Sequence, residues 1–538
     1  MNFDPHHIVI APVLIPLIAG ALMLFFDDRE RRLKTTIALI STLALLLVSF
    51  GLLRRVHFSD DPVALVYLLG NWPAPVAINL VADRLSAIML MLTALLALPA
   101  LVFATARWEK SGPHFHTLFQ FLLVGLNGAF LTGDLFNLFV FFEVMLAASY
   151  GLVLHGSGTV RIKAGLHYIA VNLLASLIFL IGIAMVFGAT GSLNMAEISM
   201  RAGDLQGFAE PALHVGLSML GLAFLVKAGM WPLGHWLVPA YSAAAAPVSA
   251  VFAILSKVGI YALLRLALLV PDSGEAFGSM IIFVGGSFTL AFASIGILAS
   301  QSMQRAAAYF VLMSSGTLLA TFGISEVAST AGALFYLLSS TLAVSAMFML
   351  VELLEREQDA AANVFAVTME AYGEANPEDD DDAEIGQMMP GALAVLGVGF
   401  SLLALVLIGL PPLSGFLAKF AILHAVIGRP SAGMTDEGTM RIVLATLVIL
   451  SGLTALIALS RMGIRTFWAP VEPFAPRVTI IETAPILFLL AVLIALAIQA
   501  GPIMDIATAT AGDLHDPARY LDAVRGAERV PPFAGEDQ

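Results

Sequence analysis

The most constraining feature of the sequence is a succession of apolar runs. Many of them reach the roughly 20 residues that a helix needs to cross the hydrocarbon core of a bilayer. Of the 538 residues, 59% are hydrophobic and only 12% are charged, whereas a soluble globular domain carries about 25% charged residues. The sequence therefore predicts an all-α membrane protein, built as one polytopic helix bundle in lipid.

Hydropathy divides the chain into about fourteen predicted transmembrane helices. The first follows a segment without Lys or Arg, so we interpret it as a retained helix rather than a secretory signal. In chain order the predicted spans are 8–26, 35–53, 78–106, 114–132, 134–154, 163–188, 211–234, 240–270, 278–299, 303–324, 328–353, 391–427, 440–467 and 479–500.

The Lys and Arg residues of the short loops favour one orientation, because cytoplasmic loops carry the excess of positive charge. With the N-terminus outside, thirteen of these residues fall in cytoplasmic loops and seven in outer loops, among them Arg84 and Arg265. We therefore expect a multi-pass protein of the cell (inner or plasma) membrane with both termini on the outer side.

The net charge of −13 comes largely from one insert, since twelve acidic residues lie between Glu352 and Glu384. Such a block is typical of a solvated loop, and we expect an acidic loop at 355–390 on the cytoplasmic side. Attraction of a partner or a cation is the alternative role. Nothing in the sequence resembles a surface that binds nucleic acid.

The chain has no cysteine, which excludes structural disulfides, thiolate metal sites and iron–sulfur clusters. Its eleven histidines form no facing pairs within spans suited to haem, and no Gly-rich loop ending in Gly-Lys-Ser/Thr is present. We therefore expect no cofactor and no metal. These observations argue against two alternative classes, a membrane redox enzyme and an ATP-driven transporter.

Three lysines, Lys227, Lys257 and Lys419, lie inside predicted spans. A charged side chain at the centre of a membrane helix costs about 3 kcal/mol, although a lysine near a helix end can extend its ammonium to the interface. None of the three is well placed for that escape. A buried lysine can hold or release a proton according to the charge beside it, which is what a proton relay requires.

Glu143 is the carboxylate that we expect to accompany these lysines. It stands alone in the apolar stretch 138–145, where it needs a partner or a cavity; a hydrogen bond made only for packing is the alternative. Asp134 follows Gly133 at a predicted helix start, and there an aspartate normally caps the free backbone N–H groups.

Prolines interrupt the lysine-bearing spans. Pro232 is predicted to open a helix just after Lys227, and the pair Pro411-Pro412 does the same before Lys419. Pro247 is a further predicted helix break. Broken helices at matching places in two halves point to a transport site.

The matching breaks suggest two inverted repeats of five helices each, since an odd number of helices reverses the topology. The predicted organisation has four parts: helices 1–3 at 1–110, a first repeat at 111–270, a second repeat with the acidic loop at 271–470, and the last helix with a polar tail at 471–538.

Polar side chains between the charges are candidates for a water-assisted pathway. They have a simpler alternative, because membrane helices use small hydroxyl residues for close packing. His424 follows Lys419 closely and is a candidate either to pass protons onward or to make a local hydrogen bond. The candidate pathway residues are Ser314, Ser315, Thr317, Ser339, Ser340 and His424.

Two stretches carry a resemblance to a known family. The stretch from Lys227 to Leu237, followed by Pro247-Val-Ser-Ala and Ser256-Lys257-Val-Gly, resembles the central motif of the proton-antiporter family. That family includes membrane subunits of proton-pumping NADH dehydrogenase and of Mrp-type cation/proton antiporters. The stretch 134–145 is similar to the fifth helix of the D-type subunit of Mrp antiporters, and the resemblance covers roughly residues 80–470.

The resemblance implies fourteen helices with inverted five-helix repeats. It also implies that Glu143 and Lys227 form the pair of the first half, Lys257 a central relay and Lys419 the lysine of the second half. There is one departure: many relatives carry histidine where this chain has serines at 314–315 and 339–340. A serine cannot hold a proton at neutral pH, so water would have to bridge that step.

From these residues we expect a proton-translocating subunit of a multisubunit Na⁺ (or K⁺)/H⁺ antiporter, a secondary transporter rather than an enzyme. Its expected partners are other hydrophobic subunits of the same complex, membrane lipid, and the ions Na⁺ or K⁺ and H⁺. The alternative is a proton-pumping subunit of a respiratory NADH dehydrogenase or membrane hydrogenase complex, which copurifying quinone-reducing subunits would reveal.

Overall fold

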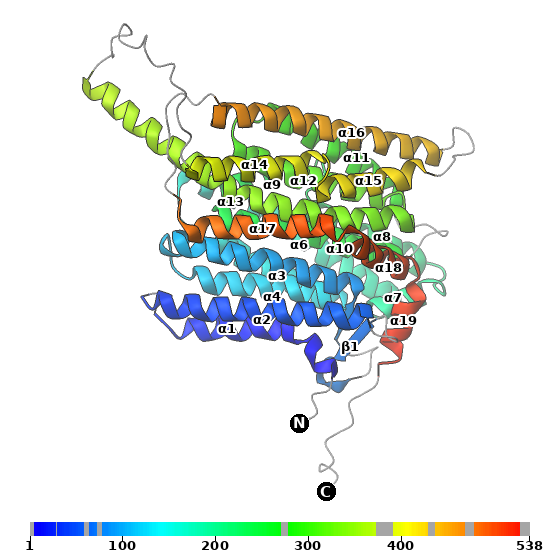
Figure 1. Ribbon diagram of the computed structural model, residues 1–538. Helices are drawn as coiled ribbons and strands as arrows, with labels where there is room; N and C mark the ends of the chain where they lie inside the picture. Colours follow the sequence, from blue (N-terminus) through cyan, green and yellow to red (C-terminus); the bar gives the residue numbers. More distant parts are fainter. Residues whose placement is uncertain are drawn as a thin grey trace.

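A computed structural model of the chain describes residues 5–27, 29–58, 64–72, 78–270, 278–372, 391–428, 436–468 and 478–527. The long helices lie side by side in one bundle, with α1 and α2 at one edge and α16 at the other (Figure 1). The helices are α1 Ala11–Leu24, α2 Arg31–Phe58, α3 Arg84–Ala106, α4 Phe115–Leu131, α5 Leu135–Val153, α6 Thr159–Thr190, α7 Met195–Ala202, α8 Ala209–Ala228, α9 Leu237–Ala243, α10 Ala246–Leu269, α11 Ser279–Ala299, α12 Met303–Phe322, α13 Val327–Tyr372, α14 Gly391–Ile408, α15 Ser414–Ile427, α16 Asp436–Gly463, α17 Ile480–Ile498, α18 Ala500–His515 and α19 Pro517–Arg525.

By length and composition, eleven of the described helices are apolar enough to cross a membrane, and α1, α4 and α15 are shorter apolar helices. The predicted all-α membrane bundle is thus confirmed as a fold class. The helices divide the chain differently from the predicted spans, because 240–270 consists of α9 and α10, and 391–427 of α14 and α15. Helix α12 carries several hydroxyl residues and is not among the helices that qualify by hydropathy.

Three mutually contacting helices, α10, α12 and α13, form the centre of the bundle. Every residue of α10 is buried, and α12 is buried along nearly its whole length. The outer helices α2, α6 and α16 expose large apolar side chains instead, as expected for surfaces that meet lipid. Polar groups on the central helices are therefore shielded by protein on all sides.

A two-stranded antiparallel sheet corrects the predicted start of the third span. Strand β1 (Ala64–Leu68) pairs with β2 (Asn79–Asp83), with Ala64 opposite Asp83 and Leu68 opposite Asn79. Residues 79–83 are strand rather than helix, and α3 begins only after Asp83, whose side chain accepts a hydrogen bond from the Ser86 backbone N–H. Hydropathy missed this boundary because a short buried strand is as apolar as a helix turn.

The N-terminal 3-10 helix η1 (Pro5–Val9), the sheet, α7 and α19 contact one another at one end of the bundle. The C-terminal part of α13 projects from the opposite end (Figure 1). The predicted acidic loop 355–390 is helical as far as Tyr372, since α13 continues beyond the predicted span; residues 373–390 lie outside the described residues. The stretch 358–366 includes three consecutive alanines, which favour helix.

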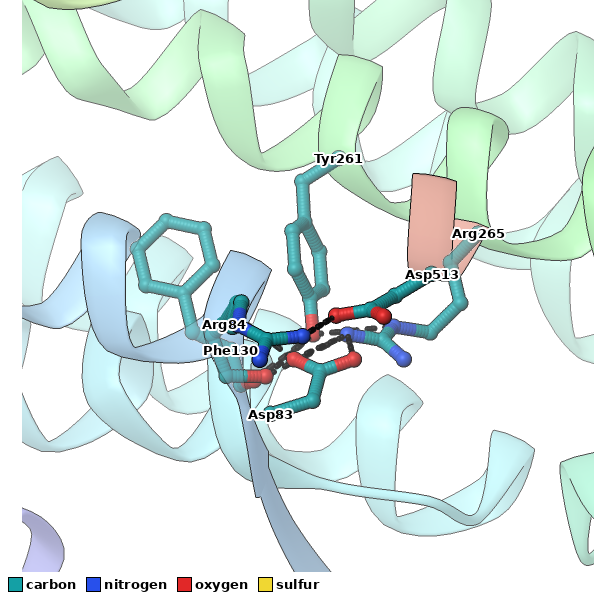
Figure 2. A network of polar contacts seen from close by, with 7 residues as sticks. Asp83, Arg84, Phe130, Tyr261, Arg265 and Asp513 are labelled. Carbon is teal, nitrogen blue, oxygen red and sulfur yellow. Dashed lines mark hydrogen bonds and ion pairs between the residues drawn. The ribbon is translucent and has the colours of Figure 1, made fainter. Parts of the chain in front are cut away.

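Arg265 corrects another expectation, because it lies inside α10 rather than in an outer loop, with a side chain only 4% exposed. Its guanidinium donates to Asp83 at 2.8–2.9 Å and to the Tyr261 hydroxyl at 3.1 Å. Arg84, next to Asp83, pairs with Asp513 of α18 (Figure 2). This network joins α3, α10 and the C-terminal helices at the end of the bundle that carries the sheet.

Candidate functional site

Lys227 lies in the last turn of α8 and is 4% exposed. Its ammonium stands 5.0 Å from the centre of the Phe142 ring and has no hydrogen-bond partner in the structure. Glu143, the next residue on α5, is half-buried, and its Oε1 atom is buried without a partner. The structure thus brings the two groups to adjoining helices, while no ion pair within 4.0 Å joins them among the described contacts.

Asp134 is the N-cap of α5, as the sequence predicted. Its carboxylate accepts a hydrogen bond from the Asn137 backbone N–H at 2.8 Å. The capping bond gives the carboxylate a structural task at the start of the helix that carries Glu143.

A glycine brings the central helix close to Lys227. A Cβ atom at Gly259 of α10 would lie 2.6 Å from the Phe224 carbonyl oxygen of α8 and 3.3 Å from Lys227 Cβ. Only glycine therefore allows the two backbones this approach. Lys257 stands two residues earlier on α10, so this contact fixes the two lysine-bearing helices against each other.

Lys257 is 1% exposed at the centre of the bundle. Its ammonium donates a hydrogen bond to Ser315 Oγ of α12 at 3.2 Å. Ser315 Oγ in turn donates to Ser256 Oγ at 3.4 Å. A hydroxyl that both accepts and donates is thus the immediate neighbour of the buried charge.

Two further serine pairs continue this contact across the bundle. Ser314 of α12 and Ser340 of α13 are hydrogen-bonded at 2.8 Å, and Ser339 of α13 and Ser414 of α15 at 2.9 Å. Successive residues of a helix point about 100° apart, so neighbouring serines can bond on two sides of one helix. The serines therefore connect α10, α12, α13 and α15 in sequence. We call this set of hydrogen-bonded serines the serine path.

A small cavity lies beside the Ser314–Ser340 and Ser339–Ser414 hydrogen bonds. It is lined by Tyr336, Ser339 and Ser340 of α13, by residues of α12 and α14, and by Gly415. The space open to the centre of a water molecule is ≈ 10 Å³, close to the roughly 10–15 Å³ that one water needs. The serine path thus has room for about one water beside it.

Lys419 lies on α15, five residues after Ser414, and is 7% exposed. Its ammonium donates to the Ile408 carbonyl oxygen at 2.9 Å, at the C-terminal end of α14. The free carbonyls of a helix C-terminus carry roughly half a negative charge and stabilise a cation. The C-terminal end of α14 thus gives Lys419 a negatively polarised partner in place of a carboxylate.

The two helix breaks are built alike. Both α8 and α14 end at a left-handed glycine, Gly229 with φ 77° and Gly409 with φ 84°. The following N–H closes the last turn in each case, from Met230 to Leu225 and from Leu410 to Leu405, both at 3.0 Å. This is the Schellman arrangement, which satisfies carbonyls that would otherwise be orphaned at a buried helix end.

The predicted break residues occupy different places relative to these helix ends. Pro232 lies between α8 and α9, and Pro411 and Pro412 lie between α14 and α15. Pro247 instead stands in the first turn of α10, where the missing N–H costs nothing.

Two candidate residues are not brought to the serine path. His424 is exposed and stacks on the Phe420 ring at 5.9 Å, whereas Lys419 is buried. The Thr317 hydroxyl donates to the Met313 carbonyl oxygen of its own helix at 2.9 Å and contacts the Tyr336 side chain, which lines the cavity, but it makes no hydrogen bond to the serines among the described contacts. Sequence reasoning missed Ser256 and Ser414, although each lies within five residues of a candidate lysine.

The site consists of buried ammonium groups, one carboxylate and hydroxyls in hydrogen-bond contact. Such groups can hold protons and pass them along, especially with water between them. No group of three or more His, Asp or Glu residues that could hold a metal ion occurs in the part of the chain that the structure describes. The arrangement suits proton transfer between buried groups.

Comparison with known proteins gives consistent findings. Residues 132–444 match the family model described as NADH:quinone oxidoreductase/Mrp antiporter, TM. The D-type subunit of a probable K(+)/H(+) antiporter of Rhizobium meliloti is 53% identical over 531 residues, covering 97% of this chain and 98% of the relative. The D-type subunit of the Na(+)/H(+) antiporter of Bacillus subtilis is 32% identical and covers 96% of this chain and 99% of the relative.

Two solved structures are similar along almost the whole chain. A chain of the Mrp complex from Dietzia sp. DQ12-45-1b superposes with a TM-score of 0.79 at 27% identity, covering 96% of this chain and 99% of its own length. A chain of respiratory complex I from Thermus thermophilus superposes with a TM-score of 0.71 at 21% identity, covering 94% and 99%. At that identity the second similarity concerns the fold alone.

Proposed function

The chain belongs to the NADH:quinone oxidoreductase/Mrp antiporter family, and on this premise we propose that it is the proton-translocating subunit of a multisubunit antiporter that exchanges Na⁺ or K⁺ for H⁺. The observation that carries the proposal is the placement of three buried lysines in one bundle, two of them at broken helices. Lysines in such positions are costly, so a transport role accounts for them better than packing does.

The proposed proton path runs through four titratable residues: Glu143, Lys227, Lys257 and Lys419. The serine contacts that begin at Lys257 support its second half, and the cavity beside Ser339 and Ser340 leaves room for water. Water would complete the gap between the contacts, because serine hydroxyls do not hold a charge at neutral pH. His424, exposed beyond Lys419, stands where a proton would pass to water or to a partner subunit.

The proposed coupling in the first half is electrostatic. While Glu143 is close, its charge stabilises the protonated form of Lys227. If the two separate, Lys227 is left with only the Phe142 ring, a weaker partner for a cation than a carboxylate. Its proton would then pass inward, toward Lys257.

The wider organisation follows from the same premise. The two helix breaks fit inverted five-helix repeats at 111–270 and 271–470, and the partners would be the other hydrophobic subunits of the complex. The outer side would be the end of the bundle that carries the sheet and α19. The acidic stretch after Arg356 would then face the cytoplasm.

A pump subunit of a respiratory NADH dehydrogenase or membrane hydrogenase is the alternative function. The full-length similarity to D-type antiporter subunits at 53% and 32% identity favours the antiporter. Purification from the native membrane distinguishes the two, because copurifying quinone-reducing subunits would support the alternative.

Substitutions of Glu143 test the proposed path. Glu143→Gln keeps the shape and removes the charge, so we expect cation-driven proton antiport in everted vesicles to stall. Glu143→Asp should retain partial activity, because the carboxylate remains but is set back by one methylene. Glu210→Gln, at the exposed start of α8, is the control. Full antiport from an assembled Glu143→Gln complex would contradict the pair.

A further inference from the structure

A cavity of ≈ 300 Å³ lies at the end of the bundle opposite the sheet, away from the lysine path. It is formed by the first turns of α2 and α4 and by the 3-10 helix η3 (Trp108–Lys110) that follows α3. Five basic side chains and one acidic side chain line it: Arg31, Lys34, Lys110, His114, His116 and Glu109.

The charge of this cavity is positive even with both histidines neutral, because three cations and one carboxylate sum to 3 − 1 = +2. The carboxylate is already engaged, since Glu109 Oε2 contacts His116 Nε2 at 3.2 Å and accepts a hydrogen bond from the Thr35 hydroxyl at 2.9 Å. The Glu109 carboxylate thus interacts with His116 and Thr35 of the protein itself. The charge that a ligand meets at the opening of the cavity is therefore positive.

A further observation points to a ligand with acceptor oxygens. Helix α4, which has 17 residues, starts at the cavity after His114 and has no side-chain cap. Uncapped backbone N–H groups at a helix N-terminus favour an anion, and phosphate in particular.

The surroundings of the cavity favour a lipid over a free anion. Along α2, beyond Arg31, the exposed side chains are large and apolar, beginning at Leu33 and continuing with Ile40, Leu43 and Leu47, which are 41–65% exposed. This is the surface on which acyl chains would lie. Basic pockets between helices at a membrane interface bind anionic headgroups.

We propose that this cavity binds the phosphate of an anionic phospholipid headgroup, whose acyl chains run along the exposed face of α2. Arg31 and Lys110 are exposed at its mouth, whereas Lys34 is 3% exposed at its base. The site lies outside the proposed path and does not depend on it. Binding can therefore fail or succeed independently of transport.

The test is a titration of the purified complex, freed of native lipid, with short-chain phosphatidylglycerol, phosphatidylcholine and inorganic phosphate, followed by native mass spectrometry. We expect phosphatidylglycerol to bind most tightly. Arg31→Gln/Lys110→Gln should lower its affinity about 25-fold, since each basic side chain near an anionic headgroup contributes about 5-fold. Arg31→Lys/Lys110→Arg keeps the charges and should preserve binding.

The matched control is Arg32→Gln/Lys163→Gln, which removes two exposed cations from the same end of the bundle outside the cavity. Unchanged affinity in this control supports a local site. An equal loss in both double variants, or no loss in the first, would overturn the proposal, because the charges would then act only as a general positive interface. Inorganic phosphate that displaces the lipid at equal concentration would also overturn it, in favour of a soluble anion.

Discussion

The serine path makes a sharp prediction at Ser340, whose hydroxyl is bonded to Ser314 across α12 and α13 at 2.8 Å. Ser340→Val and Ser340→Thr place side chains of nearly the same shape at this position. They differ in one respect, because threonine keeps the hydroxyl and valine replaces it with a methyl group. The pair therefore separates the loss of the hydrogen bond from the effect of added bulk.

The size of the effect follows from the hydrogen bond and the cavity beside it. Leaving the buried Ser314 hydroxyl without a partner costs about 1–3 kcal/mol. If that cost falls on the proton-transfer barrier, antiport slows by about 5- to 150-fold in Ser340→Val. Ser340→Ala removes an oxygen next to a space of ≈ 10 Å³, which leaves room for about one water. We therefore expect the alanine variant to stay within about 5-fold of wild type.

The assay is the initial rate of cation-driven proton antiport in everted vesicles, normalised to assembled complex on a native gel. Ser345→Val is the control for bulk in a buried part of α13, because the Ser345 hydroxyl is buried without a partner. The expected order is Thr above Val, and Ala above Val. If Ser340→Val transports like Ser340→Thr, the hydroxyl is a packing group and the path does not run through it.

Three further predictions concern charge, topology and stability. Lys257→Arg and Lys419→Arg should assemble yet lose most antiport, because arginine does not release its proton at accessible pH; wild-type transport by either would remove that position from the path. In this cysteine-free chain, single cysteines in place of Asp380 and Arg525 should react differently with an impermeant reagent in intact cells, position 525 reacting and position 380 not, and the reverse pattern would invert the orientation. Asp83→Ala leaves the buried Arg265 unpaired and should destabilise the purified complex by about 3–5 kcal/mol, a large drop in its unfolding temperature, whereas an unchanged temperature would mean that Arg265 finds another partner.

Most of the helical framework could be predicted because the length and the hydropathy of an apolar run identify a membrane helix. The lysines were found for the related reason that a charge inside an apolar run is conspicuous. Helix α12 lies near the limit of this signal, because Gln304 and Arg305 at its start lower its hydropathy, yet the span 303–324 was predicted. Its burial at the centre of the bundle explains how its hydroxyl residues are accommodated.

The remaining misses concern contacts between segments far apart in the sequence. Arg265 reads as a loop charge because its partner Asp83 is 182 residues away. Ser414 reads as a turn residue after two prolines, and only the approach of α15 to α13 gives it Ser339 as a partner. The strand β2 has no pattern that distinguishes it from a helix start without its partner β1.

The two broken helices offer their lysines different electrostatic partners, and this difference bears on the direction of transfer. Lys419 donates to the carbonyls at the end of α14, a fixed feature of the backbone that cannot move away from it. Lys227 has an aromatic face and, on the adjoining helix, a carboxylate without a hydrogen bond at one oxygen, so its environment can change with a small shift of α5. A proton path with a direction needs one group whose affinity for the proton changes, so that it releases the proton. It also needs a group whose affinity stays constant, so that it receives the proton. In the proposed relay, Lys227 is therefore the switched donor and Lys419 the receiving end, with Lys257 and the serines between them.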